Sequence, residues 1–113
     1  MDFKEYQKLA QRTSNKELSR DEHIINGALG LCGEAGEVAD LLKKGYMQGH
    51  EIDRERVLEE AGDVLWYLAE LIEWLYADLG EVAMKNIEKL NRRFPDPCGF
   101  SVERSVNREK AEG

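Results

Sequence analysis

The sequence predicts an all-α protein, an antiparallel helical bundle of about four helices per chain that is completed by dimerisation. Three observations support this fold class. The chain's two prolines, Pro95 and Pro97, both come near its end. Apolar residues recur at three- and four-residue spacing over most of the remaining sequence, which is the period of a helix face. No stretch alternates apolar and polar residues for long enough to indicate a strand.

The first two helices are expected at residues 3–12 and between Ser19 and Gly45. Apolar residues in the first segment share one helix face, and a polar run follows it. Ser19 is followed three residues later by Glu22, which is the capping-box pattern at a helix start. We expect this second helix to stop near Gly45.

Two further helices and a tail complete the predicted order. Asp53 is a suitable N-cap for a third helix, which continues to about residue 75. Asp78 and Glu81 have the spacing of a cap pair for a fourth helix, which ends at Pro95. Residues 1–95 are therefore expected to form the helical domain, and residues 96–113 a polar C-terminal tail that is extended or disordered.

The second and third helices are apolar over more than one narrow stripe. This pattern indicates burial on two sides, as in the centre of a bundle or the core of a dimer. A chain of 113 residues can bury only a small core, so association with a second copy would help to stabilise it. We expect a homodimer or a dimer of dimers (a homotetramer).

The composition excludes several classes of protein. The chain carries 23 Asp and Glu against 16 Lys and Arg, a formal net charge of −7, which argues against a nucleic-acid partner. It has no apolar run of about 18 residues, so no membrane partner is expected. Two cysteines 66 residues apart, Cys32 and Cys98, suggest no disulfide framework or zinc site. A cytoplasmic setting fits best.

The most informative feature is a repeated acidic motif. Residues 34–38 are EAGEV and residues 60–64 are EAGDV. Glu34 and Glu37 are therefore spaced i,i+3 on the second helix, and Glu60 and Asp63 are spaced i,i+3 on the third. Residues three apart share a helix face, so each pair presents two carboxylates side by side.

Glycines near these acids suggest that the two helices approach closely. Gly30, Gly33, Gly36 and Gly62 lie inside predicted helices, where each costs about 0.5–1 kcal/mol relative to alanine. We expect them to let the backbones approach and bring the four carboxylates together. Such a cluster needs a cation, and Mg²⁺, with Mn²⁺ as a possible substitute, favours oxygen ligands.

The acidic motif has two other interpretations, one without a bound cation and one with a different metal. The four acids could lie on solvated helix faces, and the residues alone leave this alternative open. A di-iron bundle requires Glu-x-x-His, but His23 and His50 are preceded at i−3 by Arg20 and Met47, which excludes it.

Beyond these acids, the sequence resembles the MazG-type, all-α nucleoside triphosphate pyrophosphohydrolases. The family motif is ExxE on one helix and ExxD on the next. Three blocks carry the resemblance: LGLCGEAGEVADLLKKG at 29–45, EEAGDVLWYLAEL at 59–71 and NIEKLNRRFP at 86–95. It extends over about residues 22–104, with one departure at PDPCGFSVERS, residues 95–105, where the chain is longer than the family turn.

The resemblance implies an enzyme that cleaves a (d)NTP between the α- and β-phosphates. Water would attack the α-phosphorus, releasing a (d)NMP and pyrophosphate, with Mg²⁺ held by the four acids. One carboxylate would orient or deprotonate the water, and the sequence does not indicate which. Glu34, Glu37, Glu60 and Asp63 are accordingly expected as both the metal-binding and the catalytic residues.

Substrate-binding residues are expected outside the acidic motif. The resemblance favours Asn86, Lys89 and Arg92 on the fourth helix as phosphate or sugar contacts. Lys43 follows the first acidic pair by about two turns and is a further candidate. Tyr67 lies one turn beyond Asp63, from where it could stack on a base. Solvated basic residues, or a core or interface aromatic, are the alternatives at these positions.

Two other functions remain open from the sequence. Phosphoribosyl-ATP pyrophosphohydrolase shares the fold and the use of metal that the resemblance implies. A non-catalytic helical module that binds a structural cation or a basic partner would also account for the acids. The GLxGEAGEV and NxxKLxxR blocks favour a general nucleotide substrate over phosphoribosyl-ATP, and the non-catalytic module stays open.

Overall fold

The structure is a computed structural model of the chain, and it describes residues 1–95 and 99–107. The chain forms two compact units, residues 1–79 and residues 80–113, and each is described by itself. The described residues contain five α-helices, one short 3₁₀ helix and no strand, which confirms the all-α prediction. The helices are α1 (Phe3–Ala10), η1 (Gln11–Thr13), α2 (Arg20–Met47), α3 (Arg54–Trp74), α4 (Leu79–Arg93) and α5 (Val102–Val106).

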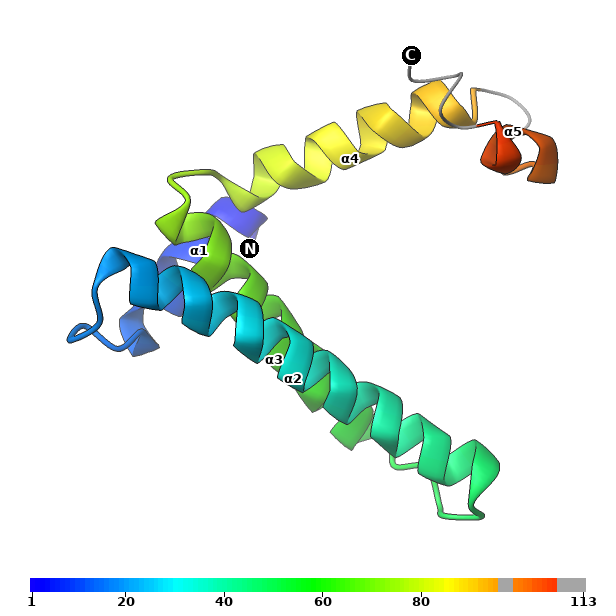
Figure 1. Ribbon diagram of the computed structural model, residues 1–113, viewed down its shortest axis with the longest axis horizontal. Coiled ribbons are helices and arrows are strands. Elements are labelled where there is room, and N and C mark those ends of the chain that lie inside the picture. Colours follow the sequence, from blue (N-terminus) through cyan, green and yellow to red (C-terminus); the bar gives the residue numbers. More distant parts are fainter. Residues whose placement is uncertain (96–98, 108–113) are drawn as a thin grey trace. The chain divides into compact units, whose positions relative to one another are not determined.

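The first unit is built on a long antiparallel hairpin of α2 and α3, which lie side by side along their length (Figure 1). Both helix starts are confirmed. The Ser19 side chain accepts from the Glu22 backbone N–H while Glu22 accepts from the Ser19 N–H, so the capping box is complete. The Asp53 carboxylate accepts from the N–H groups of Glu55 and Arg56 at the start of α3.

Helix α2 continues two residues beyond the predicted end. Gly45 lies inside it, and the side chain of Ile52 occupies the space that a Cβ at Gly45 would need. The chain then turns through Gly49, whose φ of 74° is strained for any residue with a side chain. Gly45 was predicted as a helix terminator, but it instead allows the loop to fold back onto α2.

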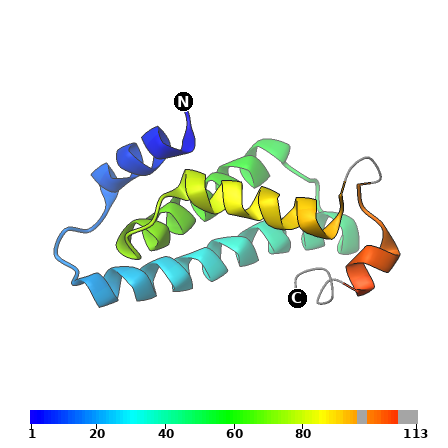
Figure 2. The same cartoon turned by 90° about the horizontal axis from the view of Figure 1, so that it is seen from above.

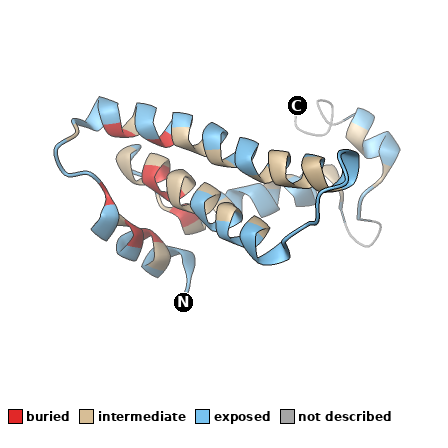
Figure 3. Ribbon diagram, turned by 90° about the horizontal axis from the view of Figure 1, so that it is seen from below, coloured by how far each residue is buried: buried red, intermediate tan, exposed pale blue. Residues whose placement is uncertain are grey.

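Helix α1 packs on α3 near the end of the hairpin where α2 begins (Figure 2). The small core of the unit is there, formed by Ala69, Ile72 and Leu79 with Tyr6 and Leu65 packed against it. Figure 3 shows the buried residues gathered on α1, the first part of α2 and the last part of α3. The opposite end of the hairpin, toward residues 48–53, is largely exposed.

Two apolar side chains on α2 remain outside this core. Ile25 is 57% exposed and Leu29 is 69% exposed. These values agree with the expectation that α2 carries a second apolar face. Dimerisation itself stays a prediction.

The second unit contains α4 and the short helix α5. Helix α4 is amphipathic and ends one residue before Phe94, whose ring lies 5.3 Å from that of Phe100. Part of the segment predicted as an extended or disordered tail is therefore helical, with Ser101 capping α5 through the Arg104 N–H. Cys98 and the last six residues of the predicted tail lie outside the described residues.

No helix in the described ranges, 1–95 and 99–107, has the length and apolar character needed to cross a membrane.

Candidate functional site

Three of the four predicted carboxylates meet between α2 and α3. Glu34, Glu60 and Asp63 each offer an oxygen within 4.8 Å of the other two. Glu34 comes from the middle of α2, while Glu60 and Asp63 come from successive turns of α3. Glu34 and Glu60 are half-buried and Asp63 is exposed, so the group is open to a ligand. We call these three residues the acidic cluster.

The electrostatics of the acidic cluster show mutual repulsion. A hydrogen bond between the side chains of Glu34 and Glu60 raises the pKa of Glu34 above its ordinary value of 4.5. Partial burial and the negative charges of Glu60, Asp63 and Glu37 raise this pKa further. Like charges disfavour ionisation of a neighbouring carboxylate, and a cation bound among these oxygens would relieve that repulsion.

Glu37 lies beside the acidic cluster and outside it. Its side chain is exposed, and its oxygens do not belong to the group of three. Its charge still acts on Glu34, one turn earlier on α2. The structure therefore brings three predicted ligands together and leaves the fourth at the rim.

The reason why α2 and α3 approach closely differs from the one predicted. A Cβ at Gly27 would lie 3.1 Å from the backbone of Leu71, so Gly27 permits the close contact. Gly30 leaves room for the ring of Tyr67. The expectation that the other helical glycines, Gly33, Gly36 and Gly62, serve the same purpose is wrong, because a Cβ at any of them would meet nothing within 4 Å.

Tyr67 lies in the layer of the hairpin next to the acidic cluster. It is one turn after Asp63 on α3, and its ring fits against Gly30, which is one turn before Glu34 on α2. Its other neighbour is the ring of Trp66, which it meets edge-on at 5.0 Å between centroids. Tyr67 therefore lies next to the acidic cluster, as its predicted role requires. Its contact with a nucleotide base stays a prediction.

The other predicted substrate-binding residues do not join the acidic cluster within the first unit. Lys43 lies nine residues after Glu34, which is the opposite side of an α-helix, and pairs with Asp40 at 3.9 Å. Three candidates, Asn86, Lys89 and Arg92, recur at three-residue spacing on α4 in the second unit. Their roles stay predictions.

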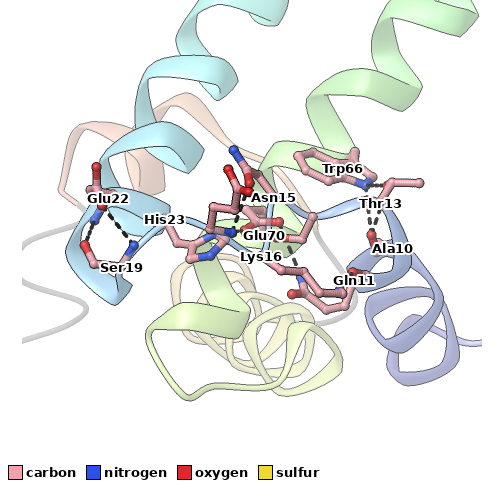
Figure 4. Close-up of polar contacts among 12 residues, drawn as sticks. Ala10, Gln11, Thr13, Asn15, Lys16, Ser19, Glu22, His23, Trp66 and Glu70 are labelled. Atoms are coloured by element: carbon pink, nitrogen blue, oxygen red, sulfur yellow. Dashed lines mark hydrogen bonds and ion pairs between the residues drawn. The ribbon is translucent and has the colours of Figure 1, made fainter.

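Sequence reasoning missed a buried polar network in the first unit, which includes His23 and Glu70 (Figure 4). Glu70 and His23 are each 1% exposed, and His23 Nδ1 lies 2.7 Å from Glu70 Oε1. Because a carboxylate only accepts, this nitrogen carries the hydrogen. The Ser14 hydroxyl donates to the same oxygen at 2.8 Å, and the His23 ring stacks on Trp74 at 3.8 Å. No periodicity in the sequence indicates that Ser14 meets Glu70, 56 residues away.

Tyr6 is a second residue that the sequence pattern did not assign to the site. Burial raises the pKa of its phenol, and the charge of Asp63 raises this pKa further. The side chain also packs against the core of the first unit with Leu65. Helix α1 thus reaches the neighbourhood of the acidic cluster, which a helical pattern at residues 3–10 does not reveal.

A family profile described as the MazG nucleotide pyrophosphohydrolase domain matches residues 26–98, which include all four acids of the repeated motif. The chain belongs to the MazG family. Its resemblance to that family, inferred from the EAGEV and EAGDV motifs, is confirmed.

A curated relative gives a more limited comparison. The MazG-family chain is 38% identical over 69 residues to the Gene 37 protein of Mycobacterium phage L5. This match covers 58% of the chain and 60% of the phage protein's length. No solved structure gives a significant match.

Proposed function

We propose that this MazG-family chain is a Mg²⁺-dependent nucleotide pyrophosphohydrolase that cleaves a (d)NTP to a (d)NMP and pyrophosphate. The observation that carries the proposal is the convergence of Glu34, Glu60 and Asp63 between two facing helices. All three lie within the segment that matches the nucleotide pyrophosphohydrolase domain. The reaction proposed is attack by water at the α-phosphorus.

The donor set of the acidic cluster fits a hard divalent cation. All three ligands are carboxylate oxygens, which Mg²⁺ and Mn²⁺ prefer. Their separations of up to 4.8 Å are close to the roughly 4.2 Å between opposite ligands of one Mg²⁺. Small side-chain rotations would bring them onto an ion. Bound there, Mg²⁺ would neutralise phosphate charge and polarise the reacting phosphoryl group.

The chain's own groups have distinct roles in this proposal. Glu34, Glu60 and Asp63 would hold the cation, whose charge would offset the repulsion among these carboxylates. Glu37, exposed and outside the acidic cluster, is available to orient the attacking water and accept its proton. Tyr67 would contact the base from the adjacent layer.

Phosphates that the cation does not reach require basic groups. We assign this contact to the polar side chains Asn86, Lys89 and Arg92 of α4, and all three lie in the segment after Gly80. That segment holds seven basic and six acidic residues, unlike the acidic segment before it. We do not include Lys43, because its side chain pairs with Asp40 on the far side of α2 from Glu34.

The assembly and setting are part of the same proposal. The exposed Ile25 and Leu29 on α2 support a homodimer or a dimer of dimers. The exposed thiol of Cys32 is free, which supports a reducing, cytoplasmic setting. Sedimentation of a folded monomer at micromolar concentration would contradict the dimer.

The function is tested by measuring pyrophosphate release from a panel of NTPs and dNTPs, with phosphoribosyl-ATP included, in the presence of Mg²⁺. We expect Asp63→Asn to weaken Mg²⁺ binding and Glu37→Gln to lower the turnover of bound substrate. Glu59→Gln is the matched control, because Glu59 is an exposed acid next to the acidic cluster and no part of it.

The outcomes separate the candidate functions. Release that both site variants lose and the control keeps supports the proposal. Release from phosphoribosyl-ATP alone would instead assign that substrate. No release from any nucleotide, with no thermal shift from Mg²⁺ plus a non-hydrolysable nucleotide and with a partner protein that co-purifies with the chain, would favour a non-catalytic module.

A further inference from the structure

The N-terminal segment of the chain is joined to the hairpin next to Tyr67. The indole N–H of Trp66 donates to the Ala10 carbonyl at 3.1 Å and to the Thr13 hydroxyl oxygen at 3.1 Å (Figure 4). Thr13 Oγ1 also donates to the Ala10 carbonyl at 3.2 Å, so each of the three groups is hydrogen-bonded to the other two. Residues 1–25 precede the segment that matches the family domain.

A second, buried contact holds the same segment. Ser14 follows Thr13 directly, is 8% exposed and donates to the buried carboxylate of Glu70. Glu70 is four residues after Trp66, one turn further along α3. Two successive turns of α3 therefore hold residues 10–14, and a buried carboxylate with two donors resists displacement.

The indole ring that makes these hydrogen bonds also packs against the ring of Tyr67. The two rings meet at an interplanar angle of 88°, the edge-on geometry that aromatic pairs favour. On its other side the Tyr67 ring occupies the space left by the missing Cβ of Gly30. The ring is thus confined between α2 and an indole whose orientation the N-terminal segment fixes.

We propose that Ala10 and Thr13 position Tyr67 for the nucleotide, acting through Trp66. In this arrangement Trp66 and Thr13 are positioning residues, and neither touches the substrate. The inference rests on the proposed function, since Tyr67 is placed there as the base contact. It adds that substrate binding depends on a segment outside the matched domain.

The test compares the kinetics of pyrophosphate release in two Thr13 variants. Thr13→Val keeps the shape and removes the hydroxyl, whereas Thr13→Ser keeps the hydroxyl. A single hydrogen bond corresponds to about a three- to tenfold change in an equilibrium constant. We expect Thr13→Val to raise KM by about that factor with kcat within about twofold, and Thr13→Ser to retain the wild-type KM.

A matched control separates positioning from general loosening of the N-terminal segment. Gln7 also joins this segment to the residues that follow α3, donating to the Ala77 carbonyl at 3.0 Å and accepting from the Leu79 N–H at 2.7 Å. These contacts do not involve Trp66. Gln7→Leu should therefore lower Tm and leave KM unchanged.

Three results would overturn the inference. An unchanged KM in Thr13→Val would show that the hydroxyl does not position the site. An equal rise in Thr13→Ser or in Gln7→Leu would attribute the effect to shape or to loosening. Each of these results is obtained with a wild-type protein that releases pyrophosphate. If the wild type itself releases none, the proposed function fails and this inference fails with it.

Discussion

Two glycines three residues apart on α2 should respond to the same substitution with opposite signs. Gly30 lies against the ring of Tyr67, and a Cβ there would overlap ring atoms. Gly33, one turn later, has no atom within 4 Å of the position of an added Cβ. The variants Gly30→Ala and Gly33→Ala therefore share their chemistry and differ in their surroundings.

The expected magnitudes follow from two competing effects. Alanine in a helix interior is more favourable than glycine by about 0.5–1 kcal/mol. Gly33→Ala should gain that amount. Gly30→Ala should gain it and lose about 1–3 kcal/mol to overpacking, because the ring is held on its other side by Trp66. The free energies of unfolding of the two variants should differ by about 1–3 kcal/mol.

Urea unfolding followed by far-UV circular dichroism measures this difference. The slope with denaturant should match the wild type in both variants, which makes the midpoints comparable. Stabilisation by Gly30→Ala, or equal destabilisation by both variants, would refute the packing of Tyr67 against Gly30. Repeating the measurement at a higher protein concentration tests whether a second copy covers Gly33, because its methyl group would then become unfavourable.

Three further outcomes are expected. Glu70→Gln should lower the free energy of unfolding by about 1–3 kcal/mol, since a neutral amide oxygen accepts more weakly from His23 and Ser14 than the carboxylate does, and an unchanged or higher free energy of unfolding in urea would contradict this. Ser19→Ala should cost about 1 kcal/mol by removing the α2 cap, seen as a Tm about 4–8 °C lower. The raised pKa of Glu34, caused by Glu60, means that the folded state binds this proton more tightly than the unfolded state. The metal-free chain should therefore lose stability as pH rises above 4.5. The increase in Tm on adding Mg²⁺ should be larger at pH 8 than at pH 5. A larger increase at pH 5 would contradict this prediction.

Local patterns were sufficient to predict most of the helices. The start of α2 at Ser19 and of α3 at Asp53 followed from short capping motifs, which act within a few residues. The end of α2 did not, because Gly45 resembles a terminator in sequence and in the structure accommodates Ile52 from the following loop. A contact made after the chain turns back cannot be recognised from helix propensity.

The same distinction applies to the site. The repeated EAG motif placed Glu34, Glu60 and Asp63 on facing turns, and the structure brings them together. The assignment of Gly33, Gly36 and Gly62 to the close approach was wrong, and Gly27, which was not assigned, is the glycine whose added Cβ would meet the backbone of Leu71. Which face of α2 meets α3 depends on packing along the whole hairpin.

The N-terminal contacts were the least predictable part of the molecule. Ser14 reaches Glu70, and Trp66 reaches Ala10, across more than 50 residues of sequence. Each residue type is ordinary at its position, and only the tertiary arrangement makes the hydrogen bonds. These contacts are also those from which the role of the N-terminal segment is inferred.

The most direct test of the central claim is the position of bond cleavage, measured by running the Mg²⁺-dependent reaction in ¹⁸O-labelled water and analysing both products by mass spectrometry. Attack by water at the α-phosphorus predicts one ¹⁸O atom in the nucleoside monophosphate and none in the pyrophosphate. Label in the pyrophosphate, or release of inorganic phosphate and a nucleoside diphosphate, would contradict the account.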